Sequence, residues 1–379
     1  MKRLLIALTI LSLTTCCTKP AGTDNNTPSG QLPEVTVPAF ARGADVSWLS
    51  EMEKDGKVFC KQDWTRADCF AVLKDCGVNA IRLRVWVNPY KGWSGKDDMV
   101  KLAVRATKAG FPVMVDFHYS DFFCDPLRQG IPKAWQADAG DISKMVTHVK
   151  DHTTEVLQAL KTVGVKPAWI QIGNETPNGF LWPLGKLWAT NGETVGGKEA
   201  FNQLYKSGYN AAKAVFPNAL VGPHLNNAYD ASRDWWYKDR QDGGCPFDII
   251  CLSHYPQDQS KMTASECNAQ AIAHIKSLYK DYKKPVIVSE VGVKTLDDEA
   301  AAAAVLKEFM DGIKDLAGCA GVFYWEPEVY DWWKPAVYGD ANAIYEYTGK
   351  RETWDNAYYM GAFLSGGRPS AKVMDALCK

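Results

Sequence analysis

The feature that most constrains this chain is the alternation of short β-branched runs with longer amphipathic segments from residue 39 onward. The segments between the runs, such as "MVKLAVRATKAG" and "ISKMVTHVKDHTTEVLQALKTVG", repeat apolar residues at helical spacing and end on glycine. The pattern predicts parallel strands connected by helices. The eight predicted strands cover residues 42–47, 78–86, 112–118, 167–175, 219–224, 247–255, 285–290 and 320–326.

Eight β/α units fit one α/β architecture best, a single (β/α)8 TIM barrel with enlarged βα loops over residues 39–379. A doubly wound sheet is the structural alternative. That fold binds phosphate groups at a glycine-rich turn after its first strand, whereas "GADVSW" contains one glycine. The barrel is therefore favoured, and its functional residues are expected where the strands end.

The first residues, "MKRLLIALTILSLTTCCTKP", combine a basic start with an apolar run that is too short to span a bilayer. They are typical of a signal peptide over residues 1–17, and the cysteine after "LSLTT" resembles a bacterial lipoprotein cleavage site. Cys16, or alternatively Cys17, would carry the lipid, and the polar residues 18–38 would form a flexible linker. We expect an exported protein, a cell-surface or outer-membrane lipoprotein held on the membrane by this anchor; plain secretion is the alternative.

Composition gives further limits on partners. The net charge of −1 provides no basic field for nucleic acid, and no nucleic-acid partner or oligomeric assembly is expected. The 14 Trp and 16 Tyr offer stacking faces for sugar rings, although an aromatic core would also use them. Apart from Cys16 and Cys17, the cysteines could form disulfides in an oxidising compartment or serve as small core residues.

Strand alternation predicts which side chains face the barrel interior. In "IRLRVWV" the leucine and the valines form the apolar set that packs on helices, which sends Arg82, Arg84 and Trp86 inward. A guanidinium group inside a barrel requires an anionic partner. The second strand therefore predicts buried ion pairs.

Two predicted strands end in glutamate. In "WIQIGNE" the isoleucines face the helices, so Gln171 and Glu175 face inward. In "PVIVSE" the parity of Glu290 matches that of Val286 and Val288, and we expect it to face inward at the mouth. A buried carboxylate is costly unless it is paired or used. Two of them with nearby arginines predict a catalytic pair.

Other predicted strand ends are also polar, and for each single residue an ordinary structural role is equally open. Six histidines and no H-x-H motif argue against a metal site, and neither a nucleophile elbow nor a phosphate loop is present. The further strand-end residues are Asp116, His118, His254, Tyr255, Trp325 and Glu326.

The supporting motifs occur in order along nearly the whole domain: "GADVSW", "RLRVWVNP", "DFHYSDFFCDP" with "IPKAW", "WIQIGNETPNGFLWPLG", "SHYP", "VIVSEVG" and "FYWEPE". Together they resemble the clan of retaining glycosidases built on (β/α)8 barrels. Within that clan the chain is most similar to glycoside hydrolase family 53, the endo-β-1,4-galactanases. The resemblance implies an enzyme that cleaves β-1,4-galactan in arabinogalactan, a pectin side chain.

The resemblance also implies roles for individual residues. Glu175 would be the general acid/base and Glu290 the nucleophile, which Tyr255 and an arginine of "RLR" would orient, and Arg84 would bind substrate. Asn174 would bind the sugar 2-hydroxyl, and Trp325 would form the floor of its subsite. The further cleft residues are Asp45, Trp86, His118 and Trp182.

No cofactor is expected. Some similar bacterial galactanases hold calcium in the loop after the seventh strand, but here that loop, "VGVKTLDDEAAAA", is short and lacks alternating oxygen donors. Two alternative functions remain open. One is another retaining barrel glycanase acting on mannan, xylan or glucan, and the other is a non-catalytic surface glycan-binding lipoprotein.

Overall fold

The computed structural model describes residues 32–354 and 358–379. The predicted signal peptide with Cys16 and Cys17, and residues 18–31 of the predicted linker, lie outside the described residues. Leu32 packs against the core beside Gly164. Within the described part of the chain, no helix is long and apolar enough to cross a membrane.

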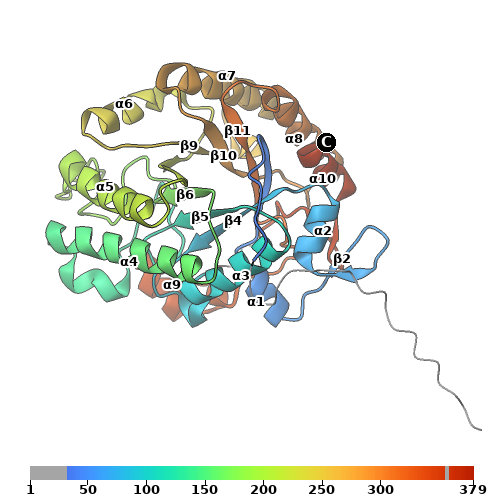
Figure 1. The fold of residues 1–379 in the computed structure, drawn as a ribbon, viewed down its shortest axis with the longest axis horizontal. Coiled ribbons are helices and arrows are strands. Elements are labelled where there is room, and N and C mark those ends of the chain that lie inside the picture. Colours follow the sequence, from blue (N-terminus) through green and yellow to red (C-terminus); the bar gives the residue numbers. More distant parts are fainter. Residues whose placement is uncertain (1–31, 355–357) are drawn as a thin grey trace, which may run out of the picture. The chain divides into compact units, whose positions relative to one another are not determined.

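Parallel strands form the centre of the molecule, and helices surround them (Figure 1). The sheet has the order β7-β6-β5-β4-β1-β11-β10-β9-β8, and its neighbours pair in parallel. The strand bounds are β1 Ala41–Asp45, β4 Ala80–Val85, β5 Val113–Phe117, β6 Trp169–Ile172, β7 Leu220–Gly222, β8 His224–Leu225, β9 Ile250–His254, β10 Val286–Val291 and β11 Cys319–Trp325.

The two ends of this order are one continuous stretch of chain. β7 pairs with β6 and β8 pairs with β9, and only Pro223 separates them. Proline has no backbone N–H to donate, which accounts for the break in the ladder. The predicted strand 219–224 thus joins both ends of the sheet and closes it into a barrel, which confirms the predicted fold class.

Amphipathic helices cover the outside of the barrel. The long helix α4 begins after Asp141, whose carboxylate accepts hydrogen bonds from two backbone amides, and it buries Met145, Val149 and Val156 against the sheet. The helix bounds are α1 Leu49–Lys54, α2 Cys69–Asp75, α3 Lys96–Lys108, α4 Ile142–Thr162, α5 Gly197–Val215, α6 Asp234–Asp242, α7 Ala264–Tyr282, α8 Glu299–Ile313, α9 Ala341–Thr348 and α10 Ala371–Cys378.

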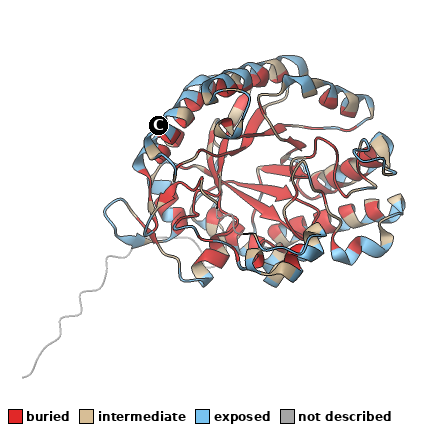
Figure 2. Cartoon of the chain, turned by 180° about the vertical axis from the view of Figure 1, so that it is seen from behind, coloured by how far each residue is buried: buried red, intermediate tan, exposed pale blue. Residues whose placement is uncertain are grey.

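An apolar layer closes the bottom of the barrel interior, and the strands are buried while the outer helix faces are exposed (Figure 2). Phe323 fills the space beside Gly43, where a Cβ atom would lie 2.1 Å from the phenyl ring. Glycine is therefore required at that position. The buried members of the layer are Ala41, Ala80, Met114, Trp169, Ile249, Cys251, Ile287 and Phe323.

The alternation rule holds for β4 but not for all of β10. Leu83 and Val85 pack between sheet and helices, as predicted. Val286 and Val288 also pack on that side, whereas Ile287 belongs to the interior layer. The pairing register shifts between Val288 and Glu290, and this bulge turns Glu290 into the interior. The expected direction of Glu290 is confirmed, but the parity argument for it was wrong.

The cysteines of the described part are free thiols, and most are buried, which favours the interpretation as small core residues. Two short hairpins lie outside the barrel, β2 Phe59–Cys60 with β3 Arg66–Ala67, and β12 Phe363–Leu364 with β13 Arg368–Pro369.

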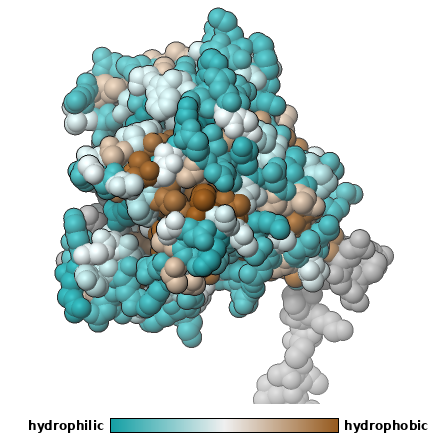
Figure 3. Space-filling model, turned by 90° about the vertical axis from the view of Figure 1, so that its left-hand side faces the viewer, coloured by the Kyte–Doolittle hydropathy of each residue, from teal (hydrophilic) through white to brown (hydrophobic). Residues whose placement is uncertain are grey.

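The longest connections leave the carboxyl ends of the strands, as expected for enlarged βα loops. They cover residues 118–141 after β5, 173–196 after β6 and 326–370 after β11, and the last includes α9. The side of the molecule drawn in Figure 3 is mostly hydrophilic, with apolar patches near its centre.

Candidate active site

The two predicted carboxylates line one cavity at the carboxyl ends of the strands. Glu175 follows β6, Glu290 lies near the end of β10, and the cavity has a volume of about 360 Å³. Its wall mixes charged and aromatic side chains from the strand ends and from the long loops. The lining includes Arg82, Arg84, His118, Phe123, Asp125, Arg128, Asn174, Tyr255, Trp325, Trp354 and Tyr358.

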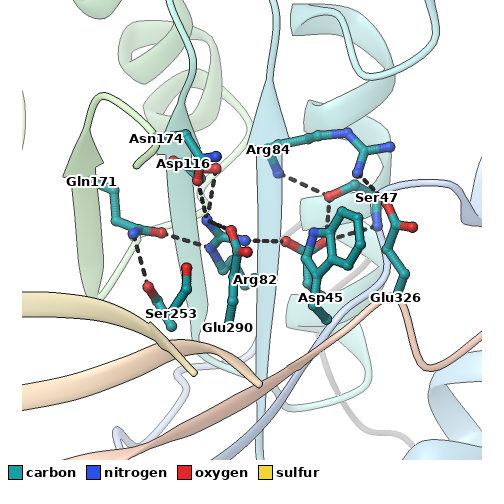
Figure 4. Close-up of polar contacts among 12 residues, drawn as sticks. Asp45, Ser47, Arg82, Arg84, Asp116, Gln171, Asn174, Ser253, Glu290 and Glu326 are labelled. Carbon is teal, nitrogen blue, oxygen red and sulfur yellow. Dashed lines mark hydrogen bonds and ion pairs between the residues drawn. The ribbon is translucent and has the colours of Figure 1, made fainter. Parts of the chain in front are cut away.

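Arg82 on β4 is the central cation of this cavity (Figure 4). It is 1% exposed, and its guanidinium nitrogens lie 2.7 Å from Asp45 Oδ2, 2.8 Å from Asp116 Oδ2 and 2.9 Å from Glu290 Oε1. Burial alone would raise the pKa of Asp116, but Arg82 and His118 lower it to about 2. One arginine thus contacts three inward carboxyl groups.

Two amides complete the surroundings of Arg82. Its Nε donates to Gln171 Oε1 at 2.6 Å, and one terminal nitrogen donates to Asn174 Oδ1 at 3.0 Å. Gln171 in turn donates to Ser289 Oγ at 3.0 Å. The guanidinium plane is therefore fixed from all sides, which also fixes the carboxylates it contacts.

The two glutamates have different environments. Glu290 receives Arg82 on one oxygen and the Tyr255 hydroxyl on the other at 2.8 Å. Burial raises the pKa of Glu290, while Arg82 and Tyr255 oppose that rise. Burial, followed by the charge of Glu290, holds the pKa of Glu175 well above its ordinary value. The environments push the two carboxyl groups toward different protonation states.

Backbone strain accompanies the position of Glu175. Its φ of 45° lies in the left-handed region, which glycine occupies far more readily than glutamate. The Gln129 side-chain amide donates to the carbonyl oxygens of Asn174 and Glu175, at 2.8 Å and 3.0 Å. These bonds hold a conformation that costs about 1–3 kcal/mol, of the kind that clusters at active sites.

Arg84, which was predicted to bind substrate, has a different partner from Arg82. It pairs with Glu326 at 2.7 Å, and its guanidinium lies 4.1 Å from the Trp48 ring centroid and 4.8 Å from that of Trp86. The arginine of "RLR" that contacts Glu290 is Arg82. The strand pattern predicted that both arginines face inward, but it did not predict which carboxylate each arginine contacts.

The remaining candidates lie at different depths. Asp45 is fully buried beneath Arg82, and Trp86 is 2% exposed behind Arg84. His118 lines the cavity and donates through Nε2 to Asp116 at 2.9 Å, because its Nδ1 accepts the backbone amide of Cys124. Of these three residues, His118 forms part of the cavity wall, and Asp45 and Trp86 lie behind it.

Trp325 and Trp182 belong to the open part of the site. Trp325 lines the cavity and packs edge-on against Tyr358, with ring centroids 4.8 Å apart. Trp182 lines a second depression of about 1010 Å³, which shares Arg128 and Trp354 with the first. The two depressions therefore adjoin at these side chains.

Several cleft residues were not predicted. Arg128 lies 4.7 Å from the Trp354 ring centroid, and Tyr358 donates to the carbonyl oxygen of Trp325 at 2.9 Å. The stretch "RETWDNAYYM", with three aromatic residues in a charged and polar segment, was the available signal for Trp354 and Tyr358. Loop aromatics of this kind have no periodicity that would reveal their direction.

Charged side chains in and beside the loop after β10 make contacts within the protein. The Asp298 carboxylate accepts the backbone amides of Ala300 and Ala301 and caps α8, and Lys294 Nζ lies 3.4 Å from Asp258 Oδ1. Calcium requires six to eight oxygen ligands. Among the residues that the structure describes, no group of three or more His, Cys, Asp or Glu side chains is placed to hold a metal.

Several known proteins are similar to this chain in sequence and in fold. The family model for glycosyl hydrolase family 53 matches residues 41–362. The arabinogalactan endo-β-1,4-galactanase of Cellvibrio japonicus is 29% identical over 96% of this chain and 94% of its own length. The endo-β-1,4-galactanase of Bacillus subtilis is 29% identical over 76% of this chain and 70% of its own length.

A solved structure agrees with these matches. The family 53 catalytic domain of Ignisphaera aggregans superposes with a TM-score of 0.73 at 27% identity, covering 92% of this chain and 99% of that one. The match of the family model covers most of the described residues and includes both glutamates at the strand ends. The chain belongs to glycosyl hydrolase family 53.

Proposed function

We propose that this protein is an endo-β-1,4-galactanase that cleaves galactan and arabinogalactan with retention of configuration. The observation that carries the proposal is the pair of carboxyl groups at the ends of β6 and β10. Glu175 has a strongly raised pKa, and Glu290 is held by Arg82 and Tyr255 in the same cavity. Retaining glycosidases use two carboxyl groups about 5 to 5.5 Å apart in these complementary states.

In the first step Glu290 attacks the anomeric carbon while Glu175 gives its proton to the departing oxygen. The bond from the anomeric carbon to that oxygen breaks, and a glycosyl ester of Glu290 forms. In the second step Glu175, now a carboxylate, removes a proton from water, and the water oxygen displaces Glu290. Both carboxyl groups return to their starting states, and the product keeps the β configuration.

Asn174 is suited to binding the sugar 2-hydroxyl. One Nδ2 hydrogen donates to the carbonyl oxygen of Cys124 at 2.8 Å, while Oδ1 is occupied by Arg82. An amide nitrogen has two hydrogens, so one remains for substrate. Asn174 lines the cavity next to Glu175, and a donor at that point would stabilise the transition state.

Cleavage within a chain requires an open cleft with several stacking surfaces. Trp325 and Tyr358 line the part near the glutamates, and Trp182 and Trp354 line its extension. The names of the relatives from Cellvibrio japonicus and Bacillus subtilis support β-1,4-galactan as the polymer. Mannan, xylan and glucan are the alternative substrates, since loop contacts decide between them.

The test is incubation with galactan, mannan, xylan and glucan, followed by sizing of the products. Galactan should lose viscosity rapidly and yield short oligosaccharides. Cleavage of mannan or xylan with none of galactan would contradict the substrate and leave the mechanism standing. Binding of galactan without any cleavage of these polymers would favour a surface glycan-binding protein instead.

We also propose that the protein is exported and carries lipid on Cys16 or Cys17. The support is the basic and apolar start followed by "TTCC". The native protein should then partition with detergent, and intact mass should include a diacylglyceryl group. Partition into water with an unmodified cysteine would contradict the anchor. A released form should sediment as a monomer.

A further inference from the structure

Two exposed tryptophans lie in contact outside the cavity described above. Trp188 is 41% exposed on the connection after β6, and Trp235 is 51% exposed in the first turn of α6. Their ring centroids are 6.0 Å apart, and the two planes are tilted by 56°. Two indoles side by side in water expose apolar surface, which is typical of a binding surface. The mechanism above uses neither residue.

Trp188 is held by a residue close to the proposed catalytic acid. Asn178 is buried and lies three positions after Glu175. Its Oδ1 accepts the backbone amides of Leu187 at 3.1 Å and of Trp188 at 2.9 Å, and its Nδ2 donates to the carbonyl oxygen of Trp188 at 3.0 Å. These bonds fix the backbone that carries the ring. A ligand that stacks on Trp188 therefore has little further ordering to bring about.

Trp235 is connected to the same stretch of chain. The next residue, Trp236, is buried, and its Nε1 donates to the carbonyl oxygen of Pro177 at 3.0 Å. This bond joins the first turn of α6 to the loop after β6, two positions from Glu175. Within the part of the chain that the structure describes, neither the Trp188 nor the Trp235 indole N–H donates to a protein atom. Both donors are available to the hydroxyl groups of a ligand.

The order of the strands shows how a polymer must cross the mouth of the barrel. Around the ring, β6 and β10 separate an arc of four strands, β5-β4-β1-β11, from a shorter arc of β7, β8 and β9. A polymer whose cleaved bond lies between Glu175 and Glu290 passes from one arc to the other. The depression lined by Arg128 and Trp354 belongs to the connections after β5 and β11, which are strands of the first arc.

The tryptophan pair belongs to the other direction. Trp188 follows β6 and Trp235 follows β8, a strand of the second arc. The sugar that Glu290 attacks is expected over Trp325, at the end of β11 in the first arc. Glu175 protonates the oxygen of the part that leaves. That part must therefore extend over the second arc, toward the pair.

The tilt of the two rings fits a chain that turns. In β-1,4-galactan each sugar is linked through an axial oxygen at C4, so successive rings are turned relative to each other. The equatorial links of β-1,4-glucan and β-1,4-mannan give an extended ribbon, which nearly coplanar indoles would match. The 56° tilt and the 6.0 Å spacing suit two successive rings of the turning chain. The axial oxygen also leaves one ring face apolar, which suits stacking on indole.

We propose that Trp188 and Trp235 form a stacking platform for the galactan residues on the leaving side of the cleaved bond. The inference rests on the proposed function, because it takes Glu175 as the acid and Glu290 as the nucleophile. The platform adds contacts only when the substrate extends beyond the bond by several sugars. Such remote binding energy favours cleavage inside a long chain over cleavage near its reducing end.

The decisive experiment compares Trp188→Ala and Trp235→Ala with the wild type on two substrates. One is a long β-1,4-galactan oligosaccharide, and the other is a nitrophenyl β-galactobioside, which has no sugar on the leaving side. The ratio of kcat/KM for the long substrate to kcat/KM for the aryl substrate should fall about tenfold in each variant, as is typical of a truncated aromatic anchor.

Trp64→Ala is the matched control for these variants. Trp64 is 55% exposed, but it lies in the turn between β2 and β3, outside the barrel, and its replacement should keep the ratio. An unchanged ratio in both platform variants would overturn the proposal. Equal losses on the long and the aryl substrate would also overturn it, because they would indicate a general structural effect.

The positions of cleavage show which side of the bond the platform serves. A galactan oligosaccharide labelled at its reducing end yields labelled fragments that are the leaving parts. In Trp188→Ala these fragments should become shorter, because long leaving parts lose their contact. Trp188→Phe should restore part of the wild-type pattern, since phenylalanine keeps a stacking face. Longer labelled fragments in Trp188→Ala would contradict the assignment to the leaving side.

Binding without turnover separates this inference from the proposed function. Galactan in the gel should retard the Glu290→Ala protein in affinity electrophoresis, and the additional change Trp188→Ala should weaken that retardation. Retardation that the second change leaves unaltered would contradict the platform alone. Retardation by galactan together with no cleavage of galactan by the wild type would contradict the proposed function alone. Stronger retardation by mannan than by galactan would contradict galactan as the occupant.

Discussion

The two ends of the barrel interior are built by the same strands but carry opposite chemistry. At the bottom, β4 and β5 contribute Ala80 and Met114 to a layer without charged side chains. Two residues further along the same strands lie Arg82 and Asp116, an ion pair at 2.8 Å. In β1 the corresponding change is from the buried Ala41 to Asp45.

Along each strand, the residues at the bottom mainly stabilise the fold, and the residues at the mouth mainly serve the active site. The bottom layer is held by close packing, as in the contact of Phe323 with Gly43. At the mouth, buried charges cost free energy and contribute little net stability even when paired. The Arg82 network there fixes Glu290 and Asn174 instead. Changes at the two ends should therefore have different consequences.

The largest effect is expected at the mouth, from removal of the carboxyl pair. Glu290→Ala should reduce turnover by several orders of magnitude, and azide should partly restore it with an α-configured product. Glu175→Ala should lose about 10²–10⁴-fold on galactan but still form the glycosyl ester from an activated phenyl galactoside. Azide should then give a β-configured product.

Product stereochemistry by NMR is the measurement for this pair. If the two configurations were exchanged between the variants, the roles of Glu175 and Glu290 would be reversed. Wild-type rates in both variants would remove the catalytic pair altogether.

A matched pair of variants compares the two ends directly. Arg82→Met leaves Asp45, Asp116 and Glu290 without their cation and should cost about 3–5 kcal/mol of unfolding free energy. Phe323→Ala leaves a cavity at the bottom and should cost about 3–5 kcal/mol as well. Only Arg82→Met should lower kcat of the folded protein strongly, because Glu290 loses its partner.

Denaturant unfolding and kinetics on the folded fraction measure both effects. Equal losses of kcat in Arg82→Met and Phe323→Ala would show that the two ends are not functionally distinct.

A smaller effect concerns pH and the carboxyl groups beside Arg84. Burial raises the pKa of Glu326 and of Glu51 to about 7, and burial with the charge of Glu326 raises that of Glu328 well above its ordinary value. The native state then binds more protons than the unfolded chain above the ordinary carboxyl range. The stability that these acids contribute is full below about pH 4.5 and is lost as pH rises through 7.

Thermal unfolding between pH 5 and 8 tests this sign. The loss should be about 2–3 kcal/mol for each carboxyl group whose pKa is raised to about 7. Glu328→Gln should flatten the dependence, whereas Glu155→Gln, an exposed carboxylate paired with Lys96, should not. A stability that increases over this range in the wild type would contradict the buried acids.

The smallest effect is expected from metal removal. We propose that the enzyme needs no calcium, because Asp298 caps a helix and Lys294 lies near Asp258 in the loop after β10. Activity and melting temperature should be unchanged after EDTA treatment. A lower melting temperature that calcium restores would contradict this proposal.

The sequence predicted the barrel well because its strands are regular. The alternation of side chains along β4 correctly predicted that Arg82 faces inward, because no bulge interrupts this strand. It could not predict the register shift before Glu290, or the break at Pro223 that divides one strand into β7 and β8. Both are local irregularities that leave the run of apolar residues looking continuous.

Within the site, the sequence identified strand-end residues but not their partners. Arg82 and Arg84 have the same parity, and only the positions of Asp116 and Glu326 separate their roles. Trp354 was missed because it lies in the irregular connection 326–370, where side-chain direction depends on tertiary contacts such as that with Arg128.

The most direct test of the central claim is to trap the glycosyl ester. A 2-deoxy-2-fluoro-β-galactobioside with an activated leaving group should react once and accumulate, because the fluorine slows the second step more than the activated first step. Intact mass should increase by one fluorinated galactobiosyl (disaccharide) unit, and peptide mapping should locate it on Glu290. A label on Glu175, or turnover with inversion and no covalent adduct, would contradict the account.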